Sequence, residues 1–286
     1  MIAFFANLFG YLLNLLYEIF SNYGIAIILF TVVLKLILLP LTIKQQKTMR
    51  KSAKIQEKLK IIQFKYKNDP QKLNQETMDL YKRENMSPMS GCLSSIIQIL
   101  LLLSVFYLVS SPLTYMKKVD TEVIDSYKQE LQLEEKTSGT AYPEITIINE
   151  KGKTDENVNI NMDFLGLDLS NVPSQNLTNP TVYIIPILYV LTSMLSMKLS
   201  MNMNKKKQKE DEKADNKENK DSTELDMMEG MNKNMMLIMP IMSVMISFIA
   251  PLGLALYWLV NNLLMIVERV VITKILDKKE EAKANE

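Results

Sequence analysis

The sequence predicts an all-α, polytopic integral membrane protein with five transmembrane helices, and three observations carry this prediction. Of its 286 residues, 48% are hydrophobic, and they are gathered in blocks of about 20 residues, the length that a helix needs to cross a hydrocarbon core. Dense charges lie between the blocks, although the formal net charge of the whole chain is only +1. Long apolar segments that alternate with charged segments are typical of a chain that crosses a bilayer several times.

The expected spans are five apolar segments: residues 23–43, 91–112, 181–199, 234–250 and 251–273. The fourth and fifth are separated only around Pro251, so we expect them to form a tight helical hairpin. Residues 1–22 place Asn7, Asn14 and Glu18 on one narrow face of a helix. This pattern favours an amphipathic helix in the outer interface of the membrane, and the alternative is a leader that is removed.

Loop charge predicts the orientation of the spans. Residues 44–90 hold 12 Lys and Arg against 5 acids, whereas residues 113–180 hold 6 against 12. The positive-inside rule places the first segment in the cytoplasm and the second outside. By alternation, residues 200–233 and the tail 274–286 are also cytoplasmic, and the N-terminus lies outside.

Two of the cytoplasmic segments have different expected structures. Residues 44–90 have a helical pattern that is broken at Asn68-Asp69-Pro70, which predicts a helical hairpin. That hairpin is either a solvated connector or a docking arm whose basic residues face anionic lipid headgroups. Residues 200–233 are mostly charged or polar and are expected to be disordered. The acidic extracytoplasmic loop, residues 113–180, is only weakly patterned.

The composition excludes most classes of catalysis. The chain has no histidine and a single cysteine, Cys92, so it cannot form an internal disulfide, a Ser-His-Asp triad or an HExxH zinc site. No glycine-rich nucleotide-binding motif occurs among the eight glycines. We therefore expect a protein that is not an enzyme and that needs no metal and no cofactor.

A lysine inside the first span is the main candidate functional residue. Lys35 lies seven residues before Thr42, about 10 Å from the inner edge of the membrane at 1.5 Å per residue. Polar side chains lie at a matching depth in three other spans: Gln98, Thr192, Ser193, Asn261 and Asn262. A lysine that faces lipid at this depth costs about 2.5–3.5 kcal/mol. The pattern therefore predicts a hydrophilic cavity that opens to the cytoplasm, with Lys35 on its wall.

The same residues also have simpler interpretations. Lys35 can extend its amine to the interface, and threonines in membrane helices often bond their own backbone. Asn261 and Asn262 can fasten neighbouring helices together, and the single tryptophan, Trp258, can be plain packing. The acid nearest in depth is Glu268, close to the inner end of the fifth span, so the sequence predicts that Lys35 has no counter-ion.

Five stretches resemble one known family. They are "YGIAIILFTVVLKLILLPLTIKQQ" at residues 23–46, "KYKNDPQKLNQETMDLYKRENMSPMSGCLSSIIQ" at 65–98, "FLGLDLS" at 164–170, "YIIPILYVLTSMLSMKLS" at 183–200 and "MPIMSVMISFIAPLGLALYWLVNNLLMIVERVVI" at 239–272. In content, order and spacing they are similar to the YidC family of membrane protein insertases, in its short, Gram-positive-like five-span form. The resemblance implies five helices around a hydrophilic groove that is open to the cytoplasm. It also implies a bacterial cell membrane location.

The resemblance assigns roles to particular residues. Lys35 matches the family's functional cation, which is usually arginine, and lysine lacks the planar five-donor fork of that side chain. Further positions that resemble substrate-facing ones are Thr31, Gln98, Trp258 and Asn262. The predicted groove set also includes the polar or aromatic neighbours Tyr257, Asn261 and Thr192. Ser87-Pro88 stands where the family usually has Asn-Pro.

The function implied by the resemblance is that of a membrane protein insertase and chaperone. It would insert nascent membrane proteins, and help them fold, through a positively charged groove without nucleotide hydrolysis. Expected partners are nascent membrane proteins and the lipid bilayer; a Sec translocon and the ribosome are left open, and no direct nucleic acid recognition is expected. The short tail, residues 274–286, is of mixed charge and does not predict ribosome tethering. Alternative functions are a membrane scaffold or biogenesis partner and a small-anion transporter.

Overall fold

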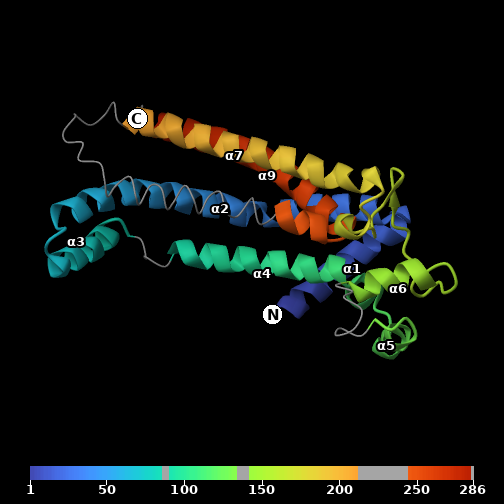
Figure 1. Cartoon of the computed structure of the whole chain (residues 1–286). Helices are drawn as coiled ribbons and strands as arrows, with labels where there is room; N and C mark the ends of the chain where they lie inside the picture. Colours follow the sequence, from blue (N-terminus) through green and yellow to red (C-terminus); the bar gives the residue numbers. More distant parts are fainter. Residues whose placement is uncertain (86–89, 134–141, 212–243, 285–286) are drawn as a thin grey trace. The chain divides into compact units, whose positions relative to one another are not determined.

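The computed structural model describes residues 1–85, 90–133, 142–211 and 244–284. Helices make up most of the described chain (Figure 1). The chain divides into two compact units. The first unit contains Met1–Lys35 and Ser104–Glu286, and the second contains Leu36–Leu103. Helices α2 (Tyr23–Lys65) and α4 (Ser90–Ser110) each contribute one end to the first unit and the other end to the second.

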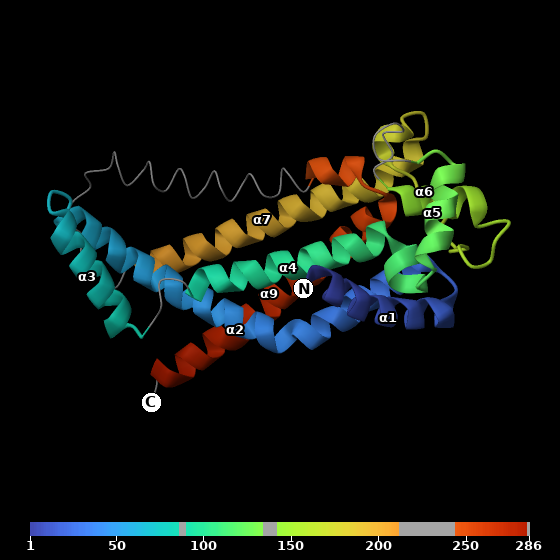
Figure 2. The ribbon, with the colours of Figure 1, turned by 90° about the horizontal axis from the view of Figure 1, so that it is seen from below.

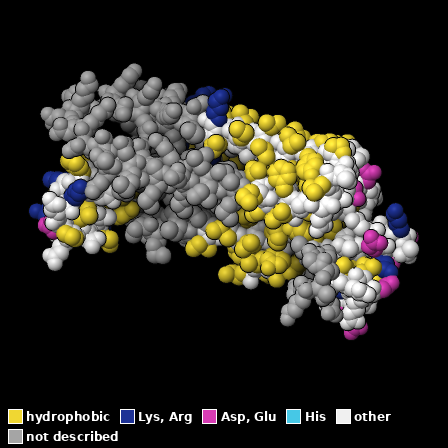
Figure 3. All heavy atoms as spheres, in the orientation of Figure 1, with side chains coloured by type: hydrophobic (Ala, Val, Ile, Leu, Met, Phe, Trp, Pro, Cys, Tyr) yellow, Lys and Arg dark blue, Asp and Glu magenta, His cyan; other side chains and the backbone are white. Residues whose placement is uncertain are grey.

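In the first unit, α7 (Ile184–Asp211) and α9 (Leu252–Ala284) pack along each other. One face of α7 is buried, with Ile185, Tyr189 and Ser196 each less than a tenth exposed. The opposite face is apolar and exposed: Ile184, Ile187, Leu188, Leu191, Met194 and Leu195. Apolar side chains accordingly cover much of this region in the space-filling view (Figure 3). A helix with an apolar outer face is suited to lipid and not to water.

The N-terminal part of α2 supplies another apolar surface to the same unit. Tyr23, Ile27, Phe30 and Leu34 recur at helical spacing and are all buried, so this face of α2 is fixed by packing.

Asn171 and Leu169 accept the backbone hydrogen bonds of Leu252 and Gly253 at the start of α9. These bonds satisfy two N–H groups that the first turn of a helix leaves unpaired.

Helix α1 (Ile2–Phe20) lies against the turn η1 (Leu113–Lys117). Its buried side consists of Ala6, Phe9, Gly10 and Leu13. Phe4, Leu8, Tyr11, Leu15 and Ile19 form an exposed apolar stripe. The contact with η1 requires glycine at position 10, because a Cβ there would lie 1.8 Å from the carbonyl oxygen of Tyr115. The interfacial location of this helix stays a prediction.

Three described helices are long and apolar enough to cross a membrane: Ile2–Phe20, Tyr23–Ser52 and Pro180–Leu199. A shorter apolar helix covers Ile96–Ser110. Residues 244–249 are helical as well, but the rest of the expected fourth span, 234–243, lies outside the described residues. The predicted class, an all-α polytopic membrane protein, is confirmed, while the count of five spans stays a prediction.

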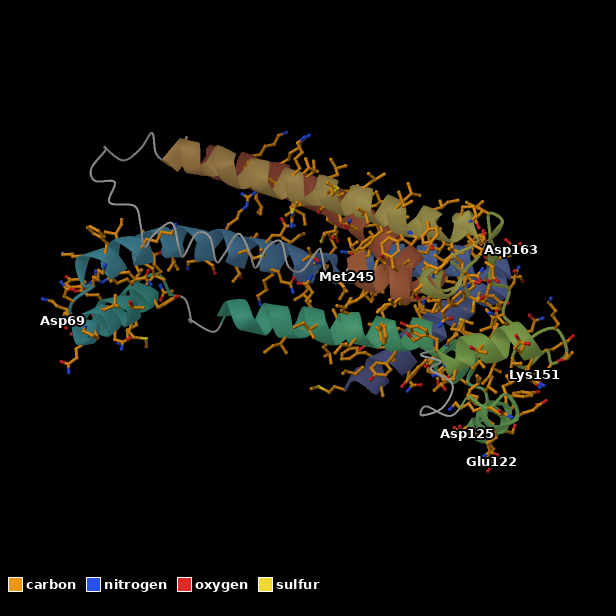
Figure 4. The ribbon with its side chains drawn as sticks, in the orientation of Figure 1. Asp69, Glu122, Asp125, Lys151, Asp163 and Met245 are labelled. Carbon is orange, nitrogen blue, oxygen red and sulfur yellow. The ribbon has the colours of Figure 1, made fainter. Side chains whose placement is uncertain are left out.

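The described residues between α4 and α7 form more regular structure than their weak pattern predicts. We call these residues, 111–133 and 142–183, the polar cap. It contains α5 (Thr121–Glu130), α6 (Pro143–Lys151), the short helical turns η1, η2 (Pro173–Gln175) and η3 (Pro180–Tyr183), and a two-stranded hairpin. In the hairpin, β1 (Asp163–Phe164) pairs antiparallel with β2 (Leu167–Asp168). The turn places Leu165 and Gly166 at positive φ, 54° and 78°, as the tight hairpin turns require. Figure 3 shows charged side chains gathered at this end of the first unit, and Figure 4 labels two of them, Lys151 and Asp163.

A buried acid organises the polar cap. One oxygen of Glu144 accepts hydrogen bonds from the backbone N–H groups of Leu113 and Thr114, at 2.8 and 3.0 Å. Its other oxygen accepts the hydroxyl of Thr114 at 2.6 Å. Burial raises the pKa of the Glu144 carboxyl, although these hydrogen bonds oppose the rise. Glu144 thus ties α6 to the first turn of η1, whose N–H groups have no helical partners.

The second unit contains α3 (Pro70–Arg83), which follows the C-terminal part of α2. Asp69 caps α3 by accepting the N–H of Lys72, and Pro70 is the first helical residue, as is common at helix starts. Helices α2 and α3 are joined by an ion pair of 2.5 Å between Lys58 and Glu84. The hydrogen bond that Lys58 donates in this ion pair lowers the pKa of the Glu84 carboxyl. Figure 2 shows the two helices folded back at this turn.

The predicted end of the third span differs from the observed helix. Helix α7 continues to Asp211, twelve residues into the segment that composition predicts to be disordered. Lysine, glutamine and glutamate are good helix formers, and extending an existing helix avoids the cost of a new nucleus. The remainder of that segment, residues 212–233, lies outside the described residues.

Candidate functional site

Lys35 lies at the edge of the buried face of α2. Its neighbours on that face, Thr31 and Leu34, are 1% and 6% exposed, whereas 21% of the Lys35 side chain is exposed. The Lys35 side chain is therefore largely shielded within the first unit. A charged group in this position has lost most of its hydration and requires a polar partner.

That partner is Glu268 on α9. The Nζ atom of Lys35 lies 3.0 Å from Oε2 of Glu268, and 12% of the glutamate side chain is exposed. The expectation of a lysine without a counter-ion is therefore wrong. Counting residues from the membrane edge placed the two groups at different depths, but the long lysine side chain covers such a difference. The site has no net charge at this pair, instead of the isolated positive charge that we expected.

The ion pair leaves hydrogen-bonding capacity unused. Oε1 of Glu268 is buried and has no hydrogen-bond partner within the described residues. Lys35 makes one side-chain hydrogen bond in the same part of the chain, although an ammonium group has three donors. A buried pair is strongly stabilising only when its remaining donors and acceptors are also satisfied. The two charged groups are therefore close enough for a strong ion pair, but the pair does not use all of its hydrogen-bond donors and acceptors among the described residues.

A second polar cluster joins α7 to α9. The side-chain amide of Asn262 donates to the hydroxyl oxygens of Thr192 and Ser193, at 3.2 and 3.1 Å. Thr192 in turn donates to the carbonyl oxygen of Tyr189 at 3.0 Å. Both N–H donors of the Asn262 side chain are therefore used between the two helices. Asn262 itself is buried, at 6% exposed. Here the structure matches the simpler interpretation, in which the asparagine fastens two helices.

The other predicted groove residues have varied surroundings. Thr31 is buried and donates to its own helix, at 2.6 Å from the carbonyl oxygen of Ile27. Tyr257 is 6% exposed, and Trp258 packs with its ring 6.2 Å from that of Tyr189. Asn261 is half-buried. Gln98 is exposed on α4 in the second unit.

The structure brings two residues of the predicted groove set, Thr192 and Asn262, into direct contact. A third, Lys35, contacts Glu268, which the predicted set omits. The sequence does carry a signal for Glu268, since it is an acid near the inner end of the expected fifth span. Intramembrane acids mark functional or paired positions. The Lys35–Glu268 pair can bind charged or hydrogen-bonding groups. Among the described residues, it includes no nucleophile that a neighbouring base activates.

Comparisons with known proteins identify the family. The sequence pattern of the family described as 60Kd inner membrane protein matches residues 15–280. The chain is 28% identical over 265 residues to a protein of Fusobacterium nucleatum named membrane protein insertase YidC, and the match covers 93% of each chain.

Two more proteins with the same name match shorter parts. One from Clostridium tetani is 35% identical over 155 residues, which cover 52% of this chain and 70% of that protein. One from Buchnera aphidicola is 45% identical over 100 residues, 35% of this chain and 19% of that protein. Because the family pattern spans nearly the whole sequence and the described helices include apolar ones long enough to cross a membrane, the chain is a multi-pass membrane protein that belongs to the 60Kd inner membrane protein family, the YidC family.

Proposed function

We propose that the protein is a membrane protein insertase and chaperone, which moves segments of nascent membrane proteins into the bilayer without nucleotide hydrolysis. The single observation that carries the proposal is the match to the family over residues 15–280. A relative that matches over 93% of both chains is named membrane protein insertase YidC. The proposed clients are therefore nascent membrane proteins.

The residues of the first unit support a physical route for insertion. The apolar outer face of α7 allows a hydrophobic client helix to pass into lipid, because transfer of apolar surface from water is favourable by about 25 cal/mol per Å². The polar part of the client is the costly part to move. The charged pair of Lys35 and Glu268 lies within the expected first and fifth spans, which are mostly apolar. The pair can replace some of the hydration that such a client group loses.

We further propose that Lys35 hosts a client's acidic group within a hydrophilic groove open to the cytoplasm. In this proposal the N-terminus lies outside and the C-terminus inside, as the excess of Lys and Arg in residues 44–90 favours. The α2–α3 segment of the second unit would then be cytoplasmic. Its exposed basic side chains would lie near anionic lipid headgroups.

A depletion-rescue experiment tests the proposed function. Bacteria depleted of their own insertase receive the wild-type protein, Lys35→Arg or Lys35→Ala, at matched expression. Insertion of a single-span client with a short acidic outer tail is scored by protease accessibility. The proposal predicts insertion with wild type and Lys35→Arg and a marked loss with Lys35→Ala. A wild-type protein that restores no insertion would instead indicate a scaffold or biogenesis partner.

A further inference from the structure

The ion pair between Lys35 and Glu268 bears on which clients the protein accepts, an inference that rests on the proposed function. A client's carboxylate and the carboxylate of Glu268 are the same chemical group. Glu268 already lies 3.0 Å from the ammonium group, and both side chains are mostly shielded from solvent. The position that a client's acidic group would take at Lys35 is therefore occupied by an acid of the protein itself.

Two features make this occupancy exchangeable. The contact uses one hydrogen bond, from Nζ of Lys35 to Oε2 of Glu268, and it lacks the two parallel bonds that an arginine makes with a carboxylate. Oε1 of Glu268 has no hydrogen-bond partner within the described residues although it is buried. An incompletely satisfied carboxylate gains hydrogen bonds when it moves to a wetter position. The resting pair is thus less stable than its short distance alone indicates.

The number of charges near Lys35 decides how an acidic client can bind. A client carboxylate that approaches Lys35 while Glu268 stays in place brings two like charges together, and this is unfavourable in a site of low dielectric. A client that displaces Glu268 restores a one-to-one pair. We propose that Glu268 is a specificity-determining residue, which occupies Lys35 between clients, so that an acidic client binds only by displacing it.

Substitution of Glu268 tests this competition. The assay compares insertion of two otherwise identical single-span clients, one with an acidic outer tail and one with the amide equivalents. Glu268→Gln removes the competing charge and keeps the size of the side chain. It should raise the ratio of acidic to neutral insertion by about fivefold, the factor expected for loss of a modest ion pair. Glu268→Asp keeps the negative charge and should leave the ratio close to that of wild type.

Glu150→Gln is the matched control. Glu150 is exposed on α6 of the polar cap, so this variant changes the net charge of the protein by the same amount without touching the ion pair. It should leave the ratio unchanged. An equal rise with Glu150→Gln would show that net charge and not competition at Lys35 is responsible, and would overturn the inference.

A second measurement uses only the wild-type protein and does not depend on how Glu268→Gln folds. A membrane-permeant carbodiimide labels accessible carboxyl groups, and mass spectrometry quantifies the label on Glu268. Addition of the acidic client should increase labelling of Glu268 severalfold, and the neutral client should not. Equal labelling with both clients, or with no client, would overturn the inference. If the wild-type protein inserts neither client, the proposed function fails; if it inserts both and neither measurement distinguishes them, only the competition fails.

Discussion

Lys35 and Glu268 are 233 positions apart in the sequence, yet their charged groups lie 3.0 Å apart. The contact joins α2 to α9 within the first unit. It replaces an isolated cation with a neutral pair, and each partner lies where an unpaired charge would be costly. Both the stability of the first unit and its response to charged clients should therefore depend on the two residues together.

A double-mutant cycle should reveal that dependence. Lys35→Met and Glu268→Gln each leave one charge without its partner, so each should destabilise the protein, whereas the double variant should be less destabilised than the sum. Loss of one partner of a fully buried pair costs about 3–5 kcal/mol, and the exposures of 21% and 12% make the expected cost smaller. Thermal unfolding in detergent measures these effects. Lys82→Met is the control, since its ion pair with Asp79 is mostly exposed. Simple additivity of the two substitutions would contradict the account.

Asn262 should contribute to the packing of α7 on α9. Asn262→Ala removes two interhelical hydrogen bonds, each worth about 0.6 kcal/mol in membrane helices, so we expect a loss of about 1 kcal/mol in unfolding free energy. Denaturation by sodium dodecyl sulfate measures the change. Asn261→Ala is the control, because within the described residues Asn261 makes no hydrogen bond to α7. Equal losses for the two variants would refute a fastening role for Asn262.

Glu144 should make the stability of the polar cap depend on pH. Because burial raises its pKa in the folded state, the protonated carboxyl is favoured on folding relative to its unfolded value. Its contribution is fully present below the unfolded pKa and is lost as pH rises through the folded pKa. Glu144→Gln should remove this dependence, since the amide oxygen can accept the N–H groups of Leu113 and Thr114. The test is the difference in melting temperature between wild type and the variant from acidic to neutral pH. A constant difference would contradict the prediction.

Gly10 should be required for the contact of α1 with η1. In Gly10→Ala the new Cβ would lie 1.8 Å from the carbonyl oxygen of Tyr115, so α1 has to move away from the turn. We expect faster proteolysis around the loop between α1 and α2. Gly253→Ala is a matched control, since its nearest neighbour is a Tyr23 side-chain atom at 3.4 Å. If both variants resist protease equally well, the close approach of α1 and η1 is not a structural requirement.

Some parts of the fold can be predicted from the sequence, and the apolar helices and the start of α3 are examples. The apolar helices follow from local patterns, because a segment that meets lipid must be apolar and must satisfy its own backbone. The start of α3 at Pro70 is likewise encoded locally, by Asp69 as cap and proline in the first turn. Both features can be read from a few neighbouring residues.

The contacts of the site could not be predicted in the same way. Lys35–Glu268 and Glu144 with Leu113 and Thr114 join residues that are distant in sequence. No local pattern reports which helix faces another, and residue counts give only a rough depth for a long flexible side chain. The buried acid in the polar cap was hidden by its acidic surroundings, where most carboxylates are exposed.

The most direct test of the central claim uses the purified protein alone. It is reconstituted into liposomes, and a purified single-span client with an acidic tail is diluted into them from denaturant, without nucleotide. Protease treatment then measures the protected tail. We predict a protected fragment well above that of empty liposomes, strongly reduced by Lys35→Ala in protein that is equally well reconstituted. Protection equal to that of empty liposomes would contradict the account, because an insertase that acts through this charged site needs no other source of energy.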